Sequence, residues 1–571
     1  MTPIFKLKIK ITKRSSCVGV GVGMGSKTTA TVVAVLLYIY AQFRRRRDLI
    51  FHGQLRLVNA ILIAITDRLF LFPLRRLLRA AAATTGLGYP YPPSYLSDFQ
   101  DAQGKTFLTN ILIRQSHLST NQYVESVNVV PFNSGQMSNS ARLELTYNEI
   151  QTTYTTSATS TAIAAPPTFI VKMARQDLKG KILNMLVGLY RECECYSKLL
   201  PSTGCPVPDI LFGAVNSFSK DFLLVLSDGS YLGPTHGYVD STTVGTMSLA
   251  PGIEVDAVKA PGILKEVYDQ VAPMNVHGKH INVSTIPVVV DMMKRACVEL
   301  SKMHIKYWKD PTLFDMDLSL ANVDSLAEAY AAVMSSWKVT KQKARTGNYE
   351  GTTPWRGSKD VDAFESLVER SLMAATRRWG KEKHGRCSAW RVLDAKSYRE
   401  DIVADANGGF TLLHGDFHSE NVFVRTIPAD CTAPEFLILD WQLPTIGDPV
   451  KDVARMIIFG ALDHLGRATY EMDILKAWWV AFVKSEESQL AKEYPWELAV
   501  LSYKYWAAHH SALFIMTCEI AKFFEEDNAS GYRMAVDKFN AICQLHGNPI
   551  VNYEKRAQLV EKLQRMDNGR T

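Results

Sequence analysis

The chain has 571 residues, of which 47% are hydrophobic and 21% charged, so it is globular in composition and long enough for more than one folded unit. Its net charge of +7 is uneven: the first 90 residues hold 15 Lys and Arg and two Asp, which leaves the remaining body at −6. An acidic body argues against a nucleic-acid-binding protein. The nine cysteines show neither zinc nor CxxC redox spacing, which favours free thiols in a reducing compartment.

The N-terminal segment, residues 1–90, is basic and contains, besides a second apolar run at Leu57–Thr66, the apolar run Thr28–Phe43, which ends at Arg44–Arg47. As a helix this run would span about 24 Å, somewhat less than the ~30 Å hydrocarbon core of a bilayer. A membrane anchor, a mitochondrial-type targeting segment and an interfacial amphipathic segment all fit the pattern. We expect membrane association through residues 28–79 with a cytoplasmic folded body, and a mitochondrial location is the alternative. Gly86–Pro93 reads as a linker.

The folded body changes character along the chain. Residues 100–226 have short β-type patterns, a helical stretch at Leu178–Leu200 and a surface insertion at Thr152–Ala165. The candidate strands are Val124–Pro131, Arg142–Tyr147, Thr168–Met173 and Phe222–Leu226. Helical periodicity dominates from residue 286 onward, at Val288–Trp308, Met472–Lys484, Trp496–Ile520, Tyr532–Leu545 and Tyr553–Met566. A β-rich part followed by a helical part predicts an α+β fold.

The strongest chemical signal is Leu413–Phe423, with the sequence LHGDFHSENVF. Between two apolar strands it carries His414, Asp416, His418 and Asn421, and Asp440 follows a further apolar strand, Phe436–Leu439. Carboxylate and amide oxygens suit Mg²⁺, which keeps several phosphate or water ligands. Phosphoryl transfer needs one carboxylate for the attacking hydroxyl and further oxygens for the metal.

These motifs resemble a known superfamily. HGDxHxxN followed by an Asp at a strand end resembles the signature of aminoglycoside phosphotransferases and choline kinases, and DWQ with GDPxxDxA resembles the ecdysteroid-kinase-like (CHK-like) branch. The resemblance extends over roughly residues 100–550. It implies a two-lobed protein-kinase-like fold, with an N-lobe at 91–228 and a C-lobe at 229–571 after the basic segment 1–90. It also implies ATP and Mg²⁺ as cofactors and a small-molecule hydroxyl as acceptor.

The resemblance assigns expected roles to individual residues. Asp416 would be the catalytic base, His414 would brace its loop, and Asn421 and Asp440 would bind Mg²⁺. Lys172, in the strand TFIVKMAR, matches the lysine that holds the α- and β-phosphates. Its expected partner is Glu192 in YRECECY, with Glu194 as the competitor on the opposite face of the helix.

The nucleotide-covering loop is less distinct. Phe132–Ser140 offers Ser134, Gly135 and Ser138 to phosphate, although a plain hairpin turn explains the same residues. LLVLSDG, which ends at Asp228 and Gly229, resembles the strand before the interlobe hinge, where adenine would bond to backbone. His304, Asp448 and Asp452 are expected to be structural.

Together these features predict a small-molecule kinase that transfers the γ-phosphate of ATP to a steroid-like alcohol, a hydroxy acid or an amino alcohol. A protein kinase is disfavoured because GDPVKDVA, rather than an APE-type segment, follows Asp440. A membrane-tethered pseudokinase that binds ATP without turnover is the alternative, and the oligomeric state is not indicated.

Overall fold

The computed structural model describes residues 60–85, 92–131, 138–149, 166–228, 247–248, 286–314, 362, 409–418, 421–425, 435–459, 464–523 and 539–568. The predicted insertion at Thr152–Ala165 and most of the linker Gly86–Pro93 lie outside these residues.

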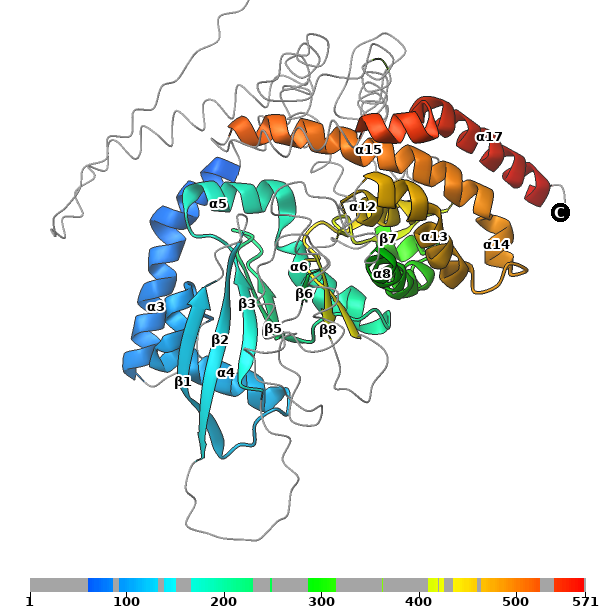
Figure 1. Ribbon diagram of the computed structural model, residues 1–571. Helices are drawn as coiled ribbons and strands as arrows, with labels where there is room; N and C mark the ends of the chain where they lie inside the picture. Colours follow the sequence, from blue (N-terminus) through cyan, green and yellow to red (C-terminus); the bar gives the residue numbers. More distant parts are fainter. Residues whose placement is uncertain are drawn as a thin grey trace, which may run out of the picture. The chain divides into compact units, whose positions relative to one another are not determined.

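In the described part of the chain, several helical segments precede the sheet, in addition to helical residues 60–66 (Figure 1). They are η1 (Asp67–Leu71), α3 (Phe72–Thr85), η2 (Leu96–Gln100) and α4 (Ala102–Arg114). The sequence predicted a β-rich region here and did not predict α4. This helix begins after Asp101, whose side chain accepts a hydrogen bond of 2.7 Å from the Gly104 backbone N–H. Such a cap satisfies a backbone donor that the first helical turn leaves unpaired.

A five-stranded antiparallel sheet forms the N-terminal lobe, in the order β1-β2-β3-β5-β4 (Figure 1). Its strands are β1 (Gln122–Pro131), β2 (Asn139–Glu149), β3 (Thr168–Met173), β4 (Ile210–Val215) and β5 (Phe222–Ser227). Along β3, Phe169, Val171 and Met173 belong to the same buried cluster as the apolar face of α4. Because side chains alternate along a strand, Lys172 lies on the other face.

The predicted helix over Leu178–Leu200 is present but broken. It consists of α5 (Leu178–Leu183), η3 (Asn184–Gly188), α6 (Arg191–Glu194) and η4 (Cys195–Leu199), followed by the short η5 (Leu200–Ser202). Gly188, with a φ of +81°, stands at the main break. Few residues other than glycine adopt this backbone conformation, so the run cannot continue as one regular helix through it.

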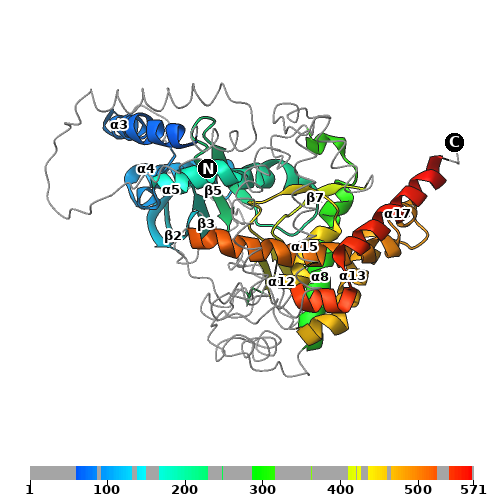
Figure 2. The same ribbon diagram turned by 90° about the horizontal axis from the view of Figure 1, so that it is seen from above.

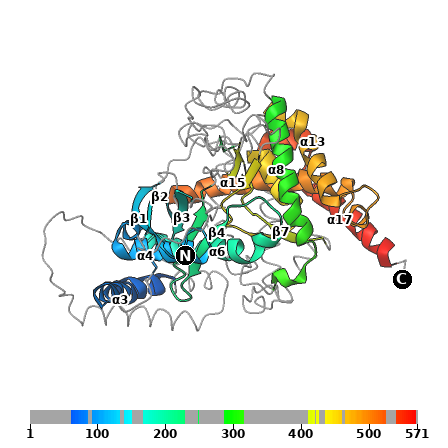
Figure 3. The same ribbon diagram turned by 90° about the horizontal axis from the view of Figure 1, so that it is seen from below.

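The C-terminal lobe is mainly helical. Its helices are α8 (Ile286–Lys306), η8 (Pro311–Phe314), α12 (Val450–Phe459), α13 (His464–Val483), α14 (Gln489–Glu493), α15 (Trp496–Phe523) and α17 (Pro549–Asn568). The α15 helix runs beside α12 (Figure 2), and α8 lies beside α13 (Figure 3). The predicted α+β, two-lobed fold is therefore confirmed.

Two small sheets carry the motif loops. β7 (Thr411–Leu413) pairs with β10 (Thr445–Gly447), while β8 (Val422–Arg425) lies between β6 (Met247–Ser248) and β9 (Glu435–Ile438). The HGD loop thus leaves one sheet and enters the other, and Asp440 follows β9. Buried side chains of β7 and β9 join α8, α12 and α13 in one hydrophobic cluster, which anchors both loops.

The structure corrects the predicted membrane-associated localisation. In the described part of the chain, which starts at residue 60 and has gaps, no helix combines the length and the apolarity needed to cross a membrane. The apolar run Thr28–Phe43, on which the prediction rested, lies outside the described residues.

Candidate active site

The loop between β7 and β8 is held by a buried carboxylate on α12. Asp452, 1% exposed, accepts hydrogen bonds from the backbone N–H groups of His414, at 2.6 Å, and Gly415, at 2.9 Å. Gly415 has a φ of +80°, and a Cβ at this position would lie 1.8 Å from the carbonyl oxygen of Leu443. The loop therefore requires both the carboxylate and the glycine.

Two buried histidines support the same loop. His414 accepts a hydrogen bond at Nδ1 from the Asp416 backbone N–H and places Nε2 2.8 Å from the Leu439 carbonyl oxygen. Because the carbonyl can only accept, His414 is neutral and protonated at Nε2, and burial lowers its pKa. His304, at the end of α8, places Nε2 3.4 Å from Asp452 Oδ2. His414 thus couples the loop of Asp416 to the strand end that precedes Asp440.

Asp416 is paired with an arginine that the sequence reading did not identify. Its Oδ1 accepts a hydrogen bond from Arg455 Nη2, which comes from α12, and lies 3.6 Å from His418 Nε2. Burial alone would raise the pKa of Asp416, but Arg455, with smaller contributions from His418 and His414, holds this pKa well below its usual range. The carboxylate is therefore ionised at neutral pH, as acceptance of a proton requires.

Asn421 is oriented by the same loop. Its Nδ2 donates to the Asp416 carbonyl oxygen at 2.9 Å and lies 3.3 Å from His418 Nε2. The Leu439 backbone N–H donates to the Asn421 carbonyl at 2.8 Å, which ties Asn421 to the strand end before Asp440. Since Nδ2 is engaged with the protein, the side-chain oxygen is the atom of this amide left to bind a cation.

Lys172 joins the two lobes. Its Nζ lies 2.8 Å from Glu192 Oε1 and 2.7 Å from Asp440 Oδ1. Glu194, the competing candidate, lies instead 3.7 Å from Lys198. Burial raises the pKa of Glu192, while the positive charge of Lys172 opposes this shift. The Asp440 carboxylate, which shares the same ammonium group, raises the pKa of Glu192 further.

Asp440 has a backbone conformation that is uncommon outside glycine, with a φ of +63°. Its second carboxylate oxygen accepts a hydrogen bond from Gln442 Nε2 at 2.9 Å. Aspartate tolerates this left-handed region better than most residues. The carboxylate is thereby directed at Lys172 of the opposite lobe.

The predicted nucleotide loop is only partly described. Ser134 and Gly135 lie outside the described residues, whereas Ser138 lies 3.2 Å, Oγ to Oγ, from Ser140, and Ser140 pairs with Lys172 across β2 and β3. Asp228 follows β5 and forms an ion pair of 2.8 Å with Arg142. Ser138 therefore directly precedes β2, and Ser140 lies on β2 opposite Lys172, while the Asp228 carboxylate forms an ion pair with Arg142 of the sheet.

Asp448 belongs to a separate buried network. It accepts hydrogen bonds from the Val450 backbone N–H at the start of α12, at 3.0 Å, and from Tyr494 Oη at 2.6 Å. Arg556 Nη2 of α17 lies 2.6 Å away and Trp506 Nε1 of α15 3.2 Å. Asp448 therefore fastens α12 to the C-terminal helices.

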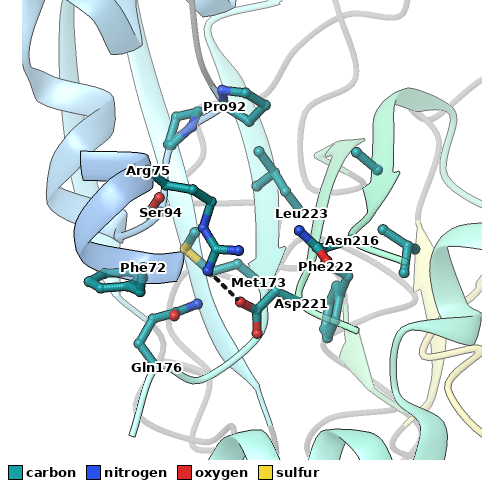
Figure 4. Close-up of a pocket in the computed structure, with 13 residues that line it drawn as sticks. Phe72, Arg75, Pro92, Ser94, Met173, Gln176, Asn216, Asp221, Phe222 and Leu223 are labelled. Atoms are coloured by element: carbon teal, nitrogen blue, oxygen red, sulfur yellow. Dashed lines mark hydrogen bonds and ion pairs between the residues drawn. The ribbon is translucent and has the colours of Figure 1, made fainter. Parts of the chain in front are cut away.

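A cavity of about 280 Å³ lies where α3 meets the ends of β3 and β5, and Figure 4 shows its lining. Arg75 of α3 reaches Asp221 at 3.3 Å, and Asp221 also binds Lys181 of α5 at 2.8 Å. Lys181 in turn contacts the buried Asp67 of η1. This ion cluster attaches the N-terminal helices to the helical run that carries Glu192.

Comparison with known proteins finds a family similarity in the part of the chain that carries the C-terminal motifs. Residues 321–486 match the phosphotransferase enzyme family, and this match includes the HGD loop, Asp440 and α12. No curated protein matches the chain.

Several solved structures resemble it distantly. A choline/ethanolamine kinase family protein from Mesorhizobium loti is 11% identical, with 81% of this chain and all of that chain covered, at a TM-score of 0.36. A microcompartment-associated aminopropanol kinase is 10% identical, with 78% and 98% covered, at a TM-score of 0.36. A thermostable mutant of the aminoglycoside phosphotransferase APH(4)-Ia is 11% identical, with 76% and 98% covered, at a TM-score of 0.29.

The family match does not test the expected CHK-like branch, which stays a prediction, and it leaves the acceptor open. Over residues 321–486 the chain is similar to the phosphotransferase enzyme family, and this match supports a small-molecule kinase.

Proposed function

We propose that this protein transfers the γ-phosphoryl group of ATP to a hydroxyl of a small molecule in one direct, in-line step. The observation that supports this most strongly is the contact set of Lys172 with Glu192 and Asp440, at 2.8 and 2.7 Å. It unites an N-lobe strand, an N-lobe helix and a C-lobe loop around a single ammonium group. A lysine held in this way is suited to bind phosphate oxygens between the lobes.

In this proposal the nucleotide lies between the β-sheet and the C-lobe loops. Lys172 binds the α- and β-phosphates, and Glu192 holds the lysine in position. Ser138, together with Ser134 and Gly135, covers the phosphates. The adenine bonds to backbone near Asp228, whose own carboxylate is engaged by Arg142.

Asp416 acts as the base. It accepts the proton of the acceptor hydroxyl, whose oxygen bonds to the γ-phosphorus as the bond from that phosphorus to the bridging oxygen breaks and ADP leaves with the electron pair. His414 is a positioning residue, because its neutral ring fixes the Asp416 backbone without touching the reacting atoms. The ionised state of Asp416 fits this role.

The residues present fit a magnesium site. Asp440 supplies a carboxylate and Asn421 an amide oxygen, which are hard ligands of the kind that Mg²⁺ prefers. Among the described residues no group of three or more His, Cys, Asp or Glu side chains could hold a metal ion, so phosphate oxygens would have to complete the coordination. Bound there, Mg²⁺ would neutralise charge on the transferring phosphates.

The domain boundaries of the proposal remain those of the sequence: a basic segment at 1–90, a nucleotide-binding lobe at 91–228 and an acceptor-binding lobe at 229–571. The position of Lys172 and Glu192 in the first lobe, and of the HGD loop and Asp440 in the second, supports this division.

The test uses the purified chain with γ-labelled ATP, Mg²⁺ and a small-molecule extract. We expect label in a small organic compound, and its loss in Asp440→Ala. Near-normal transfer by Asp440→Ala would refute the assigned role of Asp440. Mg-dependent ATP binding without transfer by the unaltered chain would instead favour a pseudokinase.

A further inference from the structure

Arg455 lies beside Asp416, whose carboxylate is the proposed base. Its Nη2 donates to Asp416 and its guanidinium lies over the Phe459 ring, 5.4 Å from the centroid, while Nε is buried and has no hydrogen-bond partner among the described residues. The side chain keeps 26% exposure, so the group is not sealed inside the protein. A guanidinium has five N–H donors and no acceptor, so most of its capacity is unused.

The face of α12 that carries Arg455 is basic. Lys451 precedes Arg455 by one helical turn, and residues four apart lie on the same side of a helix. His509 and His510 of α15 are buried nearby, and burial lowers the pKa of each. The positive charge of Arg455 lowers the pKa of His510 further, and that of Lys451 lowers the pKa of His509 further. Arg455 and Lys451 therefore lie close enough to His510 to disfavour its protonation.

Two described acids on or beside α12 have other partners than Arg455. Asp448 forms an ion pair with Arg556 and accepts a hydrogen bond from Tyr494. Asp452 accepts hydrogen bonds from the backbone of the HGD loop. Among the described residues, Asp416 alone forms an ion pair with Arg455. In the described part of the chain, Arg455 and His418 both contact Oδ1 of Asp416. Oδ2 can therefore receive the hydroxyl proton while Arg455 stays in place with N–H donors still available for an anion.

From this arrangement we infer that the acceptor carries an anionic group, a carboxylate or a phosphate, near its reactive hydroxyl, and that Arg455 binds that group. The inference rests on the proposed kinase function and specifies its substrate class. The acceptor anion binds N–H donors of Arg455 that Asp416 does not use, while Asp416 receives the hydroxyl proton. A cationic acceptor such as an amino alcohol would be repelled by the Arg455 guanidinium.

The exchange needs no other reactant. The acceptor O–H bond breaks with its proton passing to Asp416, the oxygen–phosphorus bond forms, and ADP departs as described above. Arg455 bonds only to the anionic group of the acceptor, so it is a specificity-determining residue. A bidentate pair between guanidinium and carboxylate would also fix the distance from the anion to the reactive hydroxyl.

The experiment separates a metabolite extract by ion exchange at pH 7 into anionic, neutral and cationic pools. Each pool is incubated with the full-length protein, γ-labelled ATP and Mg²⁺. The inference predicts transfer to the anionic pool. Transfer confined to the neutral or cationic pool would overturn the inference and leave the kinase function standing, whereas transfer to none of the pools would refute both.

The second arm compares Arg455→Gln with Arg455→Lys, using the labelled acceptor recovered from the active pool. We expect Arg455→Gln to raise the KM for that acceptor about 10- to 100-fold, with a smaller rise for Arg455→Lys and an unchanged KM for ATP. Arg565→Gln, which alters an arginine that is 76% exposed on α17, is the control. An unchanged acceptor KM, or equal rises in the KM for both substrates, would mean that Arg455 serves the structure of the loop rather than recognition.

Discussion

Replacing Asp452 by asparagine tests how the catalytic loop is held. The carboxylate is 1% exposed and accepts one hydrogen bond at each oxygen, from His414 N–H at 2.6 Å and from Gly415 N–H at 2.9 Å. Asparagine has a single oxygen, so one buried N–H would face an amide NH₂ group. A hydrogen bond to a charged group contributes about 1.5–3 kcal/mol, and a buried unsatisfied donor costs about 1–3 kcal/mol. We therefore expect Asp452→Asn to lower the free energy of unfolding by about 3–5 kcal/mol.

The same substitution should impair chemistry more than nucleotide binding. Asp416 moves with the loop, and small displacements of a reacting group can reduce turnover about 100-fold, whereas Lys172 lies on β3, outside the loop. Urea denaturation and the rate of label transfer measure the two effects. The control is Asp473→Asn, because Asp473 is 61% exposed and its contact with Lys294 is 3.6 Å. A variant Asp452→Asn with the stability and kcat of the unaltered chain would refute this explanation of the loop.

Three further predictions concern the glycine of the loop, the buried histidines and the N-terminal ion cluster. Gly415→Ala should lose at least about 2 kcal/mol of stability in urea together with its activity, because the new Cβ would clash with the Leu443 carbonyl in a strained backbone conformation; a stable, active variant would contradict this. Stability should fall as the pH drops from 7 to 5.5, because burial lowers the pKa of His509 to about 3 and that of His510 as well, whereas the unfolded chain protonates near pH 6.5. The two histidines together should lower the free energy of unfolding by about 3 kcal/mol at pH 5.5. A His509→Gln, His510→Gln double variant that keeps the same pH dependence would disprove the assignment of this loss to the two histidines. Lys181→Met should cost about 3 kcal/mol of unfolding free energy, since it leaves Asp67 and Asp221 with the partly exposed Arg75 in place of two cations, and an unchanged urea midpoint would argue against the cluster.

Much of the fold could be predicted because strand and helix patterns are local. The predicted strand Thr168–Met173 coincides with β3, and the predicted helix from Trp496 begins where α15 begins. The helix over Leu178–Leu200 was predicted as one piece, since periodicity does not reveal the positive φ of Gly188. The α4 helix was missed, although Asp101 before a run with Phe107, Leu108, Ile111 and Leu112 at helical spacing was available as a signal.

The contacts within the candidate site also differ in how far the sequence predicts them. Asp416 and Asn421 lie in one contiguous motif, so their proximity follows from the sequence. The contact of Lys172 with Asp440 spans 268 residues and was not predicted, because the family resemblance indicated only Glu192 as the partner of this lysine. The role of Arg455 was not predicted, because its contact with Asp416 depends on how α12 packs against the loop between β7 and β8. Its spacing from Lys451 on a helix directly after the motif was the one available signal.

The most direct test of the account is to measure phosphoryl transfer and Mg-ATP affinity side by side for the unaltered chain and Asp416→Asn. We expect the variant to bind Mg-ATP with nearly unchanged affinity, because Lys172 and Asp440 are intact. Its transfer rate should fall at least about 100-fold, because the neutral amide cannot accept the hydroxyl proton. Transfer at the unaltered rate by Asp416→Asn would contradict the assignment of Asp416 as the base and, with it, the mechanism proposed for this kinase.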